Sequence, residues 1–293
     1  MNEVDKRLDL LEKKLTKIYE RAADEIGQNW EAYITKIDKE IAGIEKKYNK
    51  AKIDGDETLK KRYGRELSQA KKEKTLMNGY YQDLTKQTAT RITKVNQIAT
   101  AYINNELPEV YSLGYNYIGT AAIEQIEGIS FTLYNAETIK QLSTIDKTLL
   151  PYKAIDEKKD IRWNTQKLNS AVLQGILQGD TMDEIAGRFV DVMKMNETVA
   201  IRNARTAVTS AENSGRFEAM HNLSEKGLSV KKQWLAANDS HTREAHSELD
   251  GEIIDYDLPF TNSIGEIMFP GDPDADPENV YNCRCAIRSV IEA

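Results

Sequence analysis

Four side chains toward the end of the sequence have the chemistry of a metal site. His241 and His246 are separated by four residues, and Cys283 and Cys285 by one. Imidazole nitrogens and thiolates are the donors that a tetrahedral zinc ion prefers, and each pair is close enough in sequence to contact one ion. The stretch between the pairs is rich in proline and aspartate, and such a loop-rich segment gains stability from a bound metal. We therefore predict a structural zinc site at these four residues.

The same residues allow other interpretations. Asp239 or Asp272 can replace His241 as a ligand. The thiols can instead be small buried side chains, with the histidines as polar surface groups. A third interpretation is a hydrolase in which Asp239, His241 and His246 activate water, alone or on a metal ion. The sequence contains no nucleophile motif and no glycine-rich phosphate loop, so we expect that the chain is not an enzyme.

These groups lie in a small acidic α+β lobe that we predict for residues 229–293. Strands are expected at 230–236, 252–256, 266–269 and 286–291, with prolines marking the loops between them. After Ala236 the sequence holds three arginines and no lysine against thirteen aspartates and glutamates. The two cysteines of this lobe, with one residue between them, would close only a small and strained disulfide ring.

The region before the lobe, residues 161–228, is predicted to be helical. Apolar residues recur every three or four positions, and Gly179 ends the first helix. Thr181 and Glu184 have the spacing of a capping box, which opens the next helix. A further helix is expected from Asn196 to Leu223, with Gly227 as its C-cap.

Residues 1–107 are predicted to form a long antiparallel helical hairpin, a coiled-coil-like arm. Helical spacing of apolar residues runs over 2–51, and the sequence around Gly55 makes a turn. A second helical run, which includes Met77, continues to Ile103 and is expected to stop before Pro108. The arm can be a projecting device for docking, or two helices folded onto the rest of the protein as scaffold.

Residues 108–160 are predicted to be a mixed connecting region. It begins with a short helix over 108–127, followed by a strand at 129–134 and a helix capped by Asn135. The charged segment 144–160, which contains Pro151, is expected to be a linker. The predicted fold class is mainly α, with the helical hairpin, a central helical bundle and the small C-terminal α+β lobe.

From about Arg202 onward the sequence resembles the phage Mu F-like minor head protein family, also described as phage head morphogenesis proteins. The order and spacing of short fragments over some 85 residues carry the resemblance. The fragments are Arg202-Asn-Ala-Arg205-Thr206-Ala, Ala211-Glu-Asn213-Ser-Gly215-Arg216, Lys232-Gln-Trp234, Asp239-Ser-His-Thr242-Arg243-Glu-Ala-His246, Leu249-Asp-Gly251, Pro259-Phe260, Phe269-Pro270-Gly271-Asp272-Pro273 and Asn282-Cys283-Arg284-Cys285.

The resemblance implies a minor capsid protein of a tailed bacteriophage. Such a protein enters the procapsid in few copies, is associated with the portal vertex, and acts in head morphogenesis and in genome packaging or ejection. Its partners would be the portal protein and the inner capsid or scaffold. Its location would be the virion head, assembled in the host cytoplasm.

Two sets of basic residues are candidates for interaction with partners. Arg202, Arg205 and Arg216 are spaced so that a helix places them roughly on one face, where they can bind a portal surface or form internal salt bridges with acidic residues. The second set lies in the arm and comprises Lys60, Lys61, Arg62 and Arg65. This set allows a weak, salt-dependent DNA contact, or is simply a solvated helix face, because acidic residues are interleaved with it.

Composition and charge argue against a membrane-spanning protein, a secreted protein and a general nucleic-acid-binding protein. The net charge is −7, and the mean hydropathy is −0.60. Residues 1–107 hold 22 Lys and Arg against 18 Asp and Glu, so any nucleic-acid contact is expected in that half. No run of about 18 apolar residues is present, which argues against a membrane-spanning helix. The charged N-terminal sequence lacks the apolar core of a secretory signal.

Overall fold

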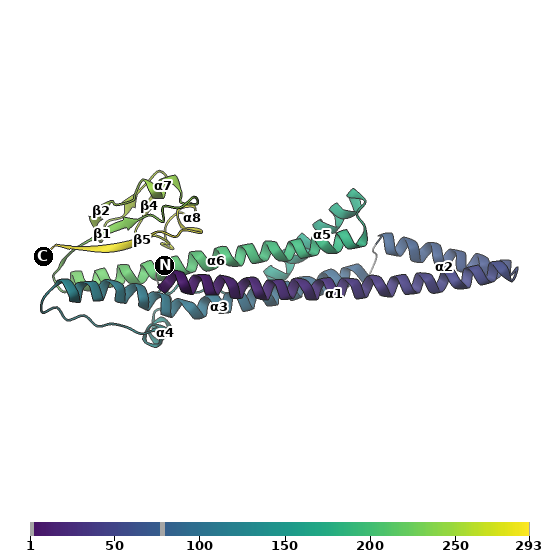
Figure 1. Ribbon diagram of the computed structural model, residues 1–293, viewed down its shortest axis with the longest axis horizontal. Helices are drawn as coiled ribbons and strands as arrows, with labels where there is room; N and C mark the ends of the chain where they lie inside the picture. The colour runs from purple at the N-terminus through teal and green to yellow at the C-terminus, as the bar shows by residue number, and fades with distance from the viewer. Residues whose placement is uncertain (1–2, 77–79, 293) are drawn as a thin grey trace. The chain divides into compact units, whose positions relative to one another are not determined.

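The computed structural model describes residues 3–76 and 80–292, and most of them are helical, which confirms the mainly α class (Figure 1). Met77 of the predicted second helical run lies outside the described residues. No described helix has the length and apolar character needed to cross a membrane. The helices are α1 (Glu3–Ile53), α2 (Glu57–Leu76), α3 (Tyr80–Gln125), α4 (Ala136–Ile145), α5 (Glu157–Gln178), α6 (Met182–Glu225), α7 (Glu244–Ser247) and α8 (Pro277–Val280), and the strands are β1 (Ser229–Leu235), β2 (Ile253–Asp255), β3 (Phe260–Thr261), β4 (Glu266–Ile267) and β5 (Ala286–Glu292).

The chain forms two compact units. The arm unit combines Lys17–Asn96 with Ile155–Glu197, and the lobe unit combines the segment before Lys17 with Gln97–Ala154 and the chain from Thr198 onward. Each unit therefore joins segments that are far apart in the sequence. The long helices α1, α3 and α6 contribute residues to both units.

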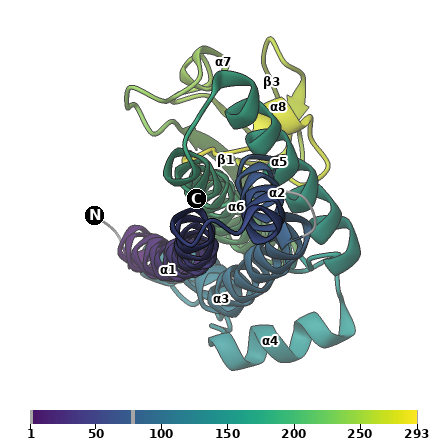
Figure 2. The ribbon, with the colours of Figure 1, turned by 90° about the vertical axis from the view of Figure 1, so that its right-hand side faces the viewer.

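The arm unit packs its parts of α1, α3, α5 and α6 around an apolar core, and Figure 2 shows α1, α3 and α6 nearly end-on. The ring of Trp30 in α1 meets the edge of Phe189 in α6, with ring centres 5.0 Å apart. Burial of large apolar side chains at helical spacing is the main driving force for such a bundle. The buried set is Tyr19, Ala22, Ile26, Trp30, Ile92, Val95, Leu168, Val172, Ile185, Phe189, Val192 and Met193.

A layer of polar side chains crosses this core. The Oδ2 atom of Asp160 accepts hydrogen bonds from Thr93, Asn96 and Asn164, at 2.8 to 2.9 Å. Asn96 also accepts a hydrogen bond of 2.7 Å from the Tyr19 hydroxyl. Because buried polar groups cost free energy when they lose their partners, such a layer favours one register of the helices over others.

The turn that follows α1 lies at the predicted position. Gly55 has φ +73°, a conformation that residues with a Cβ rarely adopt. Asp56 then caps α2, because its Oδ1 accepts hydrogen bonds from the backbone N–H groups of Thr58 and Leu59. The chain therefore reverses direction at the position that the sequence indicated.

Two helices run further than the sequence predicted. The prediction that a helix stops before Pro108 is wrong, because Pro108 lies inside α3. Leu107, Val110 and Tyr111 are all buried there, and the packing of this continuous apolar face outweighs the hydrogen bond that proline removes. The two helices predicted on either side of Asn196 are likewise one helix, α6. The predicted caps at Thr181 and Gly179 are confirmed.

The strand predicted at residues 129–134 is absent from the described structure, although Asn135 caps α4 as predicted. The backbone of Tyr134 pairs with a side chain instead of a second strand. The Asn116 side chain accepts a hydrogen bond from the Tyr134 N–H and donates one to its carbonyl, at 2.9 and 2.6 Å. An amide side chain thus replaces a strand partner, which sequence alternation does not reveal.

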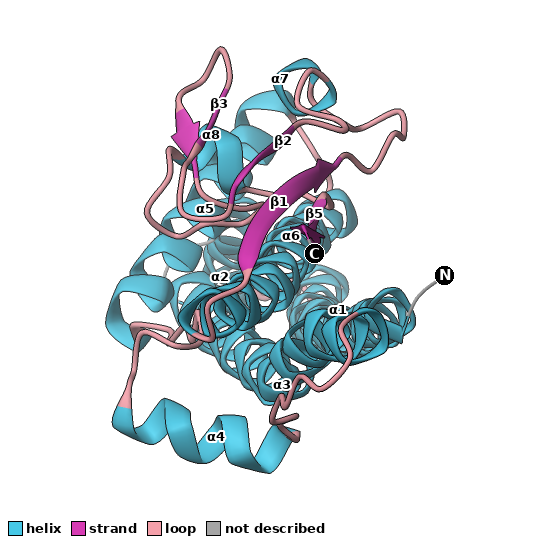
Figure 3. Ribbon diagram, turned by 90° about the vertical axis from the view of Figure 1, so that its left-hand side faces the viewer, coloured by secondary structure: helices cyan, strands magenta, loops and turns pink. Residues whose placement is uncertain are grey.

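The C-terminal lobe, residues 229–292, is built on a three-stranded antiparallel sheet with the order β2-β1-β5, which Figure 3 shows with β1 in the middle. Val230, Lys232 and Trp234 of β1 are buried, and the residues between them are more exposed. This alternation is that of a strand with one face on a core. β3 and β4 form a separate short hairpin.

The buried lysine of β1 gives the lobe a predicted pH response. The Nζ atom of Lys232 donates a 2.8 Å hydrogen bond to the Met268 carbonyl and lies 5.2 Å from the ring centres of Phe217 and Phe260. Burial lowers the pKa of Lys232 from 10.5 to about 8. Between these two values the unfolded chain holds a proton that the folded chain has released, so stability rises with pH.

We therefore expect the free energy of unfolding to increase from about pH 8 to pH 10.5, by at most about 1.4 kcal/mol for each pH unit. Urea denaturation at intervals of half a pH unit measures this slope. Lys232→Met is the matched control, because it keeps the apolar stem and removes the ammonium group. An equal slope in both proteins would contradict the prediction.

The helices α3 and α6 cross at unusually short distance within the lobe unit. A Cβ atom on Gly114 would lie 2.1 Å from the Glu212 carbonyl oxygen, and one on Gly215 would lie 2.3 Å from the Tyr111 carbonyl oxygen. Each glycine therefore admits the backbone of the opposite helix into the space of a missing side chain. This contact fixes the section of α6 on which the C-terminal lobe rests.

Candidate metal centre

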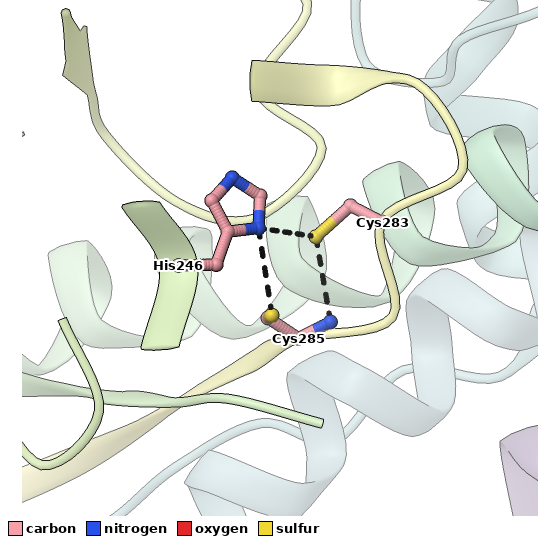
Figure 4. A group of neighbouring side chains, drawn as sticks. All are labelled: His246, Cys283 and Cys285. Atoms are coloured by element: carbon pink, nitrogen blue, oxygen red, sulfur yellow. Dashed lines mark hydrogen bonds between the residues drawn. The ribbon is translucent and has the colours of Figure 1, made fainter. Parts of the chain in front are cut away.

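Three of the four residues predicted as metal ligands lie together in the C-terminal lobe. His246 is on α7, whereas Cys283 and Cys285 precede β5, and their potential ligand atoms all lie within 4.8 Å of one another (Figure 4). Cys283, Cys285 and Ile287 are buried, and the residues between them are not. The one-residue spacing of the cysteines thus follows from an extended chain that turns alternate side chains inward.

The distances within this cluster fit a tetrahedral ion. The Nδ1 atom of His246 is 3.5 Å from the Cys283 Sγ and 3.7 Å from the Cys285 Sγ. Nitrogen and sulfur ligands at their usual bond lengths to zinc are about 3.6 Å apart when the ion is tetrahedral. Nδ1 therefore already has, from each of the two sulfurs, the separation that a shared ion requires.

Both sulfur atoms receive backbone hydrogen bonds. The Cys285 N–H points to the Cys283 Sγ at 3.4 Å, and the Ala237 N–H points to the Cys285 Sγ. The hydrogen bond between the two thiols lowers the pKa of Cys285 below its ordinary value, and the same interaction together with burial raises the pKa of Cys283. The proton of the pair is therefore held more firmly by Cys283 than by Cys285.

The imidazole of His246 is held on its other sides as well. Its Nε2 atom is 3.3 Å from the Oδ1 of Asn279, and its ring meets the Trp234 ring at 71° with centres 5.3 Å apart. Asn279 is fully buried on α8. Asn279 could not be predicted from the sequence, because a single asparagine in an acidic loop carries no spacing signal.

The structure places His241 outside this cluster. His241 lies on an exposed turn, where its backbone N–H donates a hydrogen bond of 2.9 Å to Asp239. The alternative ligands are engaged elsewhere. Asp239 pairs with Arg284 at 2.9 Å, and Asp272 accepts hydrogen bonds from the N–H groups of Met268 and Asp274. His241 is therefore not among the donors that the structure brings together at His246.

One face of α6 positions the segment that carries the cysteines. Four side chains on this face, called here the α6 anchor residues, contact the backbone of residues 282–287 in order along the chain. Thr206 accepts a hydrogen bond from the Asn282 N–H, and Thr209 donates one to the Cys283 carbonyl. Asn213 donates a hydrogen bond to the Cys285 carbonyl and accepts one from the Ile287 N–H. Arg216 donates a hydrogen bond to the Ile287 carbonyl. The distances are 2.7 to 3.2 Å.

The spacing of the anchor residues explains how a helix can follow an extended chain. Thr206, Thr209, Asn213 and Arg216 are three or four residues apart, so they lie on one side of α6. Asn282 has φ +58°, a left-handed conformation that asparagine tolerates better than most residues. Figure 1 shows β5 beside α6, and these hydrogen bonds hold the Cys283–Cys285 segment against the helix.

The three arginines predicted as an interaction surface have different environments. Arg202 is exposed, whereas Arg205 pairs with Glu12 of α1 at 2.6 Å. Arg216 is buried, pairs with Glu212 of its own helix and stacks its guanidinium 4.6 Å from the ring centre of Tyr117. Two of the three thus serve internal packing.

The basic set of the arm lies on α2. Lys60 pairs with Glu57 at 2.8 Å and Arg62 with Glu66 at 2.9 Å, while Lys61 and Arg65 are exposed. Half of the predicted basic surface is therefore neutralised by acids one turn away on the same helix. Such exposed pairs add little stability, and they reduce the local potential that would attract phosphate.

Comparison with known proteins identifies the region that contains the cluster. Residues 166–288 match the family described as Phage Mu protein F like protein. The chain is 27% identical over 192 residues to the Minor head protein GP7 of Bacillus phage SPP1, which covers 64% of the chain and 61% of that protein. It is 31% identical over 131 residues to the NAD(+)--arginine ADP-ribosyltransferase EFV of Enterococcus faecalis, which covers 43% of the chain and 26% of that protein.

An uncharacterized protein of Haemophilus influenzae is 32% identical over 127 residues, and the match covers 43% of the chain and 25% of that protein. The chain thus spans about a quarter of the length of two of these relatives and three fifths of the third. No solved structure gives a significant match. The matched region 166–288 contains the α6 anchor residues, His246, Cys283 and Cys285.

Proposed function

We propose that this chain, whose residues 166–288 form a Phage Mu protein F-like region, is a minor head protein of a tailed bacteriophage that acts in head morphogenesis. The observation that supports this most directly is the similarity to the minor head protein of phage SPP1 over 64% of the chain. The similarity covers more residues than the cysteine-bearing lobe alone, so it includes part of the helical framework.

We further infer that the chain associates with the portal protein and with the inner capsid or scaffold, in the virion head that assembles in the host cytoplasm. A contribution to genome packaging or ejection would follow from that position. We place this docking on the described helices that precede the lobe, because the two cysteines of the lobe are buried inside it.

Sedimentation of a phage lysate tests this proposal. In a lysate of the phage that encodes the chain, we expect the chain to sediment with procapsids and with mature heads. Particles made without the portal protein are the matched control, and we expect them to lack the chain. If the chain stays in the soluble fraction in both lysates, the proposal is wrong; if portal-deficient particles retain it, the inferred portal contact is wrong.

We propose that the chain is not an enzyme. Substrates of a hydrolase must reach the metal or the activated water, but residues His246, Cys283 and Cys285 are only 1, 2 and 4% exposed. The transferase activity in the name of the Enterococcus relative belongs to a protein of which the match covers 26%. A DNA-associating role gains no support from the paired cations of α2.

We propose that His246, Cys283 and Cys285 hold a structural zinc ion. Support comes from the fit of the donor distances to a tetrahedral ion and from the backbone N–H groups that point to both sulfurs. A bound ion would supply a cross-link between α7 and a segment 37 residues later in the chain. Such a cross-link stabilises a loop-rich lobe whose strands are short.

A further inference from the structure

The hydrogen bonds around His246 determine which ring nitrogen can bind a metal. A neutral imidazole has one protonated and one unprotonated nitrogen, and only the unprotonated nitrogen can be a ligand. Figure 4 shows Nδ1 of His246 directed at Cys283 and Cys285, with the second ring nitrogen on the side away from both sulfurs. The partner of that second nitrogen, Asn279, therefore decides the state of the first.

The orientation of the Asn279 amide follows from its neighbour Asn262. The Oδ1 atom of Asn262 accepts hydrogen bonds from two backbone N–H groups, those of Ile264 at 2.9 Å and Gly265 at 3.1 Å. Backbone N–H groups can only donate, so the oxygen of Asn262 must face them and its Nδ2 must point the other way. That Nδ2 lies 3.0 Å from the Oδ1 of Asn279.

The orientation of the Asn279 amide determines which ring nitrogen of His246 carries the proton. Because Nδ2 of Asn262 donates, the Asn279 atom that faces it is an oxygen, and this oxygen also lies 3.3 Å from Nε2 of His246. An oxygen acceptor requires that Nε2 carries a proton. Nδ1 is then the nitrogen that is free of a proton in the neutral ring, and it is the nitrogen that faces the thiols.

We infer that Asn279, oriented by Asn262, is a positioning residue that keeps His246 in the tautomer whose Nδ1 can bind zinc together with Cys283 and Cys285. This inference rests on the proposed zinc site. It also gives a role to the β3–β4 hairpin, because Asn262 lies in its turn, where its N–H donates to the Gly265 carbonyl. Asn279 is held on α8, which Asp276 caps through the Glu278 N–H at 2.8 Å.

The tautomer of His246 can be determined in the metal-free protein. In the metal-free, reduced protein at a pH where the imidazole is neutral, nitrogen-15 NMR of the three histidines distinguishes protonated from unprotonated ring nitrogens. We expect Nε2 of His246 to be protonated and Nδ1 unprotonated, and His246→Ala assigns the signals. An unprotonated Nε2 in the folded protein would overturn the inference.

Cobalt(II) titration tests the consequence for metal binding, because tetrahedral cobalt with thiolate ligands has a visible absorption band. We expect Asn279→Leu to weaken cobalt binding roughly 10- to 100-fold, as loss of such a support generally does. Asn279→Asp keeps an oxygen acceptor and should retain the affinity. Asn49→Leu, on the exposed side of α1, is the matched control for the same chemical change and should leave binding unaltered.

The outcomes separate this inference from the zinc proposal on which it rests. If the unmodified protein binds no cobalt and no zinc, the zinc proposal fails, and the NMR result still decides the tautomer. If the unmodified protein binds cobalt and a folded Asn279→Leu variant binds it equally well, the positioning role of Asn279 is wrong. Should Asn279→Leu fail to fold, Asn262→Leu, outside direct contact with the ring, provides the same comparison.

Discussion

Zinc is expected to bind the purified protein in a ratio of about one ion per chain, and His246→Ala or Cys283→Ser is expected to abolish that binding. Removal of either side chain leaves two donors, too few to hold a structural ion at moderate concentration. Because an ion that binds only the folded state stabilises it, zinc at 100 times its dissociation constant should add about 2.7 kcal/mol to the free energy of unfolding. Elemental analysis and thermal unfolding with and without a chelator measure both effects.

His241→Ala is the matched control for this experiment. It makes the same chemical change five residues away from His246, on a turn that the structure places outside the cluster. We expect it to leave the zinc content and the response to chelator unchanged. Zinc binding that requires His241 would show that the ligand set expected from the sequence is the correct one. Absence of zinc, together with unchanged melting in His246→Ala and Cys283→Ser, would remove the metal from this lobe.

Gly215→Ala is expected to destabilise the protein by about 3 kcal/mol, the upper end of the usual cost of overpacking. The added Cβ would lie 2.3 Å from the Tyr111 carbonyl oxygen and 3.0 Å from the Tyr115 nitrogen, and both are backbone atoms that cannot rotate away. Relief requires the two helices to separate, which loosens the section of α6 that carries the anchor residues. Urea denaturation measures the change, and Gly114→Ala should behave in the same way.

Gly187→Ala separates this clash from the general effect of alanine in a helix. Gly187 lies in the same helix, but no atom lies within 4 Å of the Cβ that it would gain. Alanine favours the helix over glycine, so we expect this variant to be more stable by roughly 0.5 to 1 kcal/mol. If Gly215→Ala were stabilised to the same extent, the proposed close crossing of α3 and α6 would be incorrect.

Local sequence signals predicted those parts of the fold that local interactions determine. The turn at Gly55, the capping box at Thr181 and the end of a helix at Gly179 each involve groups within four residues, and each was predicted correctly. The error at Pro108 has the opposite origin. Whether a helix continues through proline depends on what its apolar face packs against, and that information lies elsewhere in the chain.

The candidate site likewise combines features that local spacing reveals with features that depend on contacts elsewhere in the chain. The spacing of Cys283 and Cys285 and the presence of His246 directed attention to the residues that the structure brings together. The exclusion of His241 depends on a turn stabilised by Asp239, and the role inferred for Asn279 depends on a contact with a hairpin 17 residues earlier. Neither contact produces a pattern in the sequence. Whether the cluster binds a metal stays a prediction.

The α6 anchor residues contact only the backbone of the segment that they hold. Thr206, Thr209, Asn213 and Arg216 bond to N–H and carbonyl groups, which every residue except proline supplies in full. Substitutions at outward positions such as Arg284 and Arg288 would remove their contacts with Asp239 and Gln233 but leave these backbone hydrogen bonds to α6 in place. The charge of this edge can therefore differ without loss of the hydrogen bonds that attach the segment to α6.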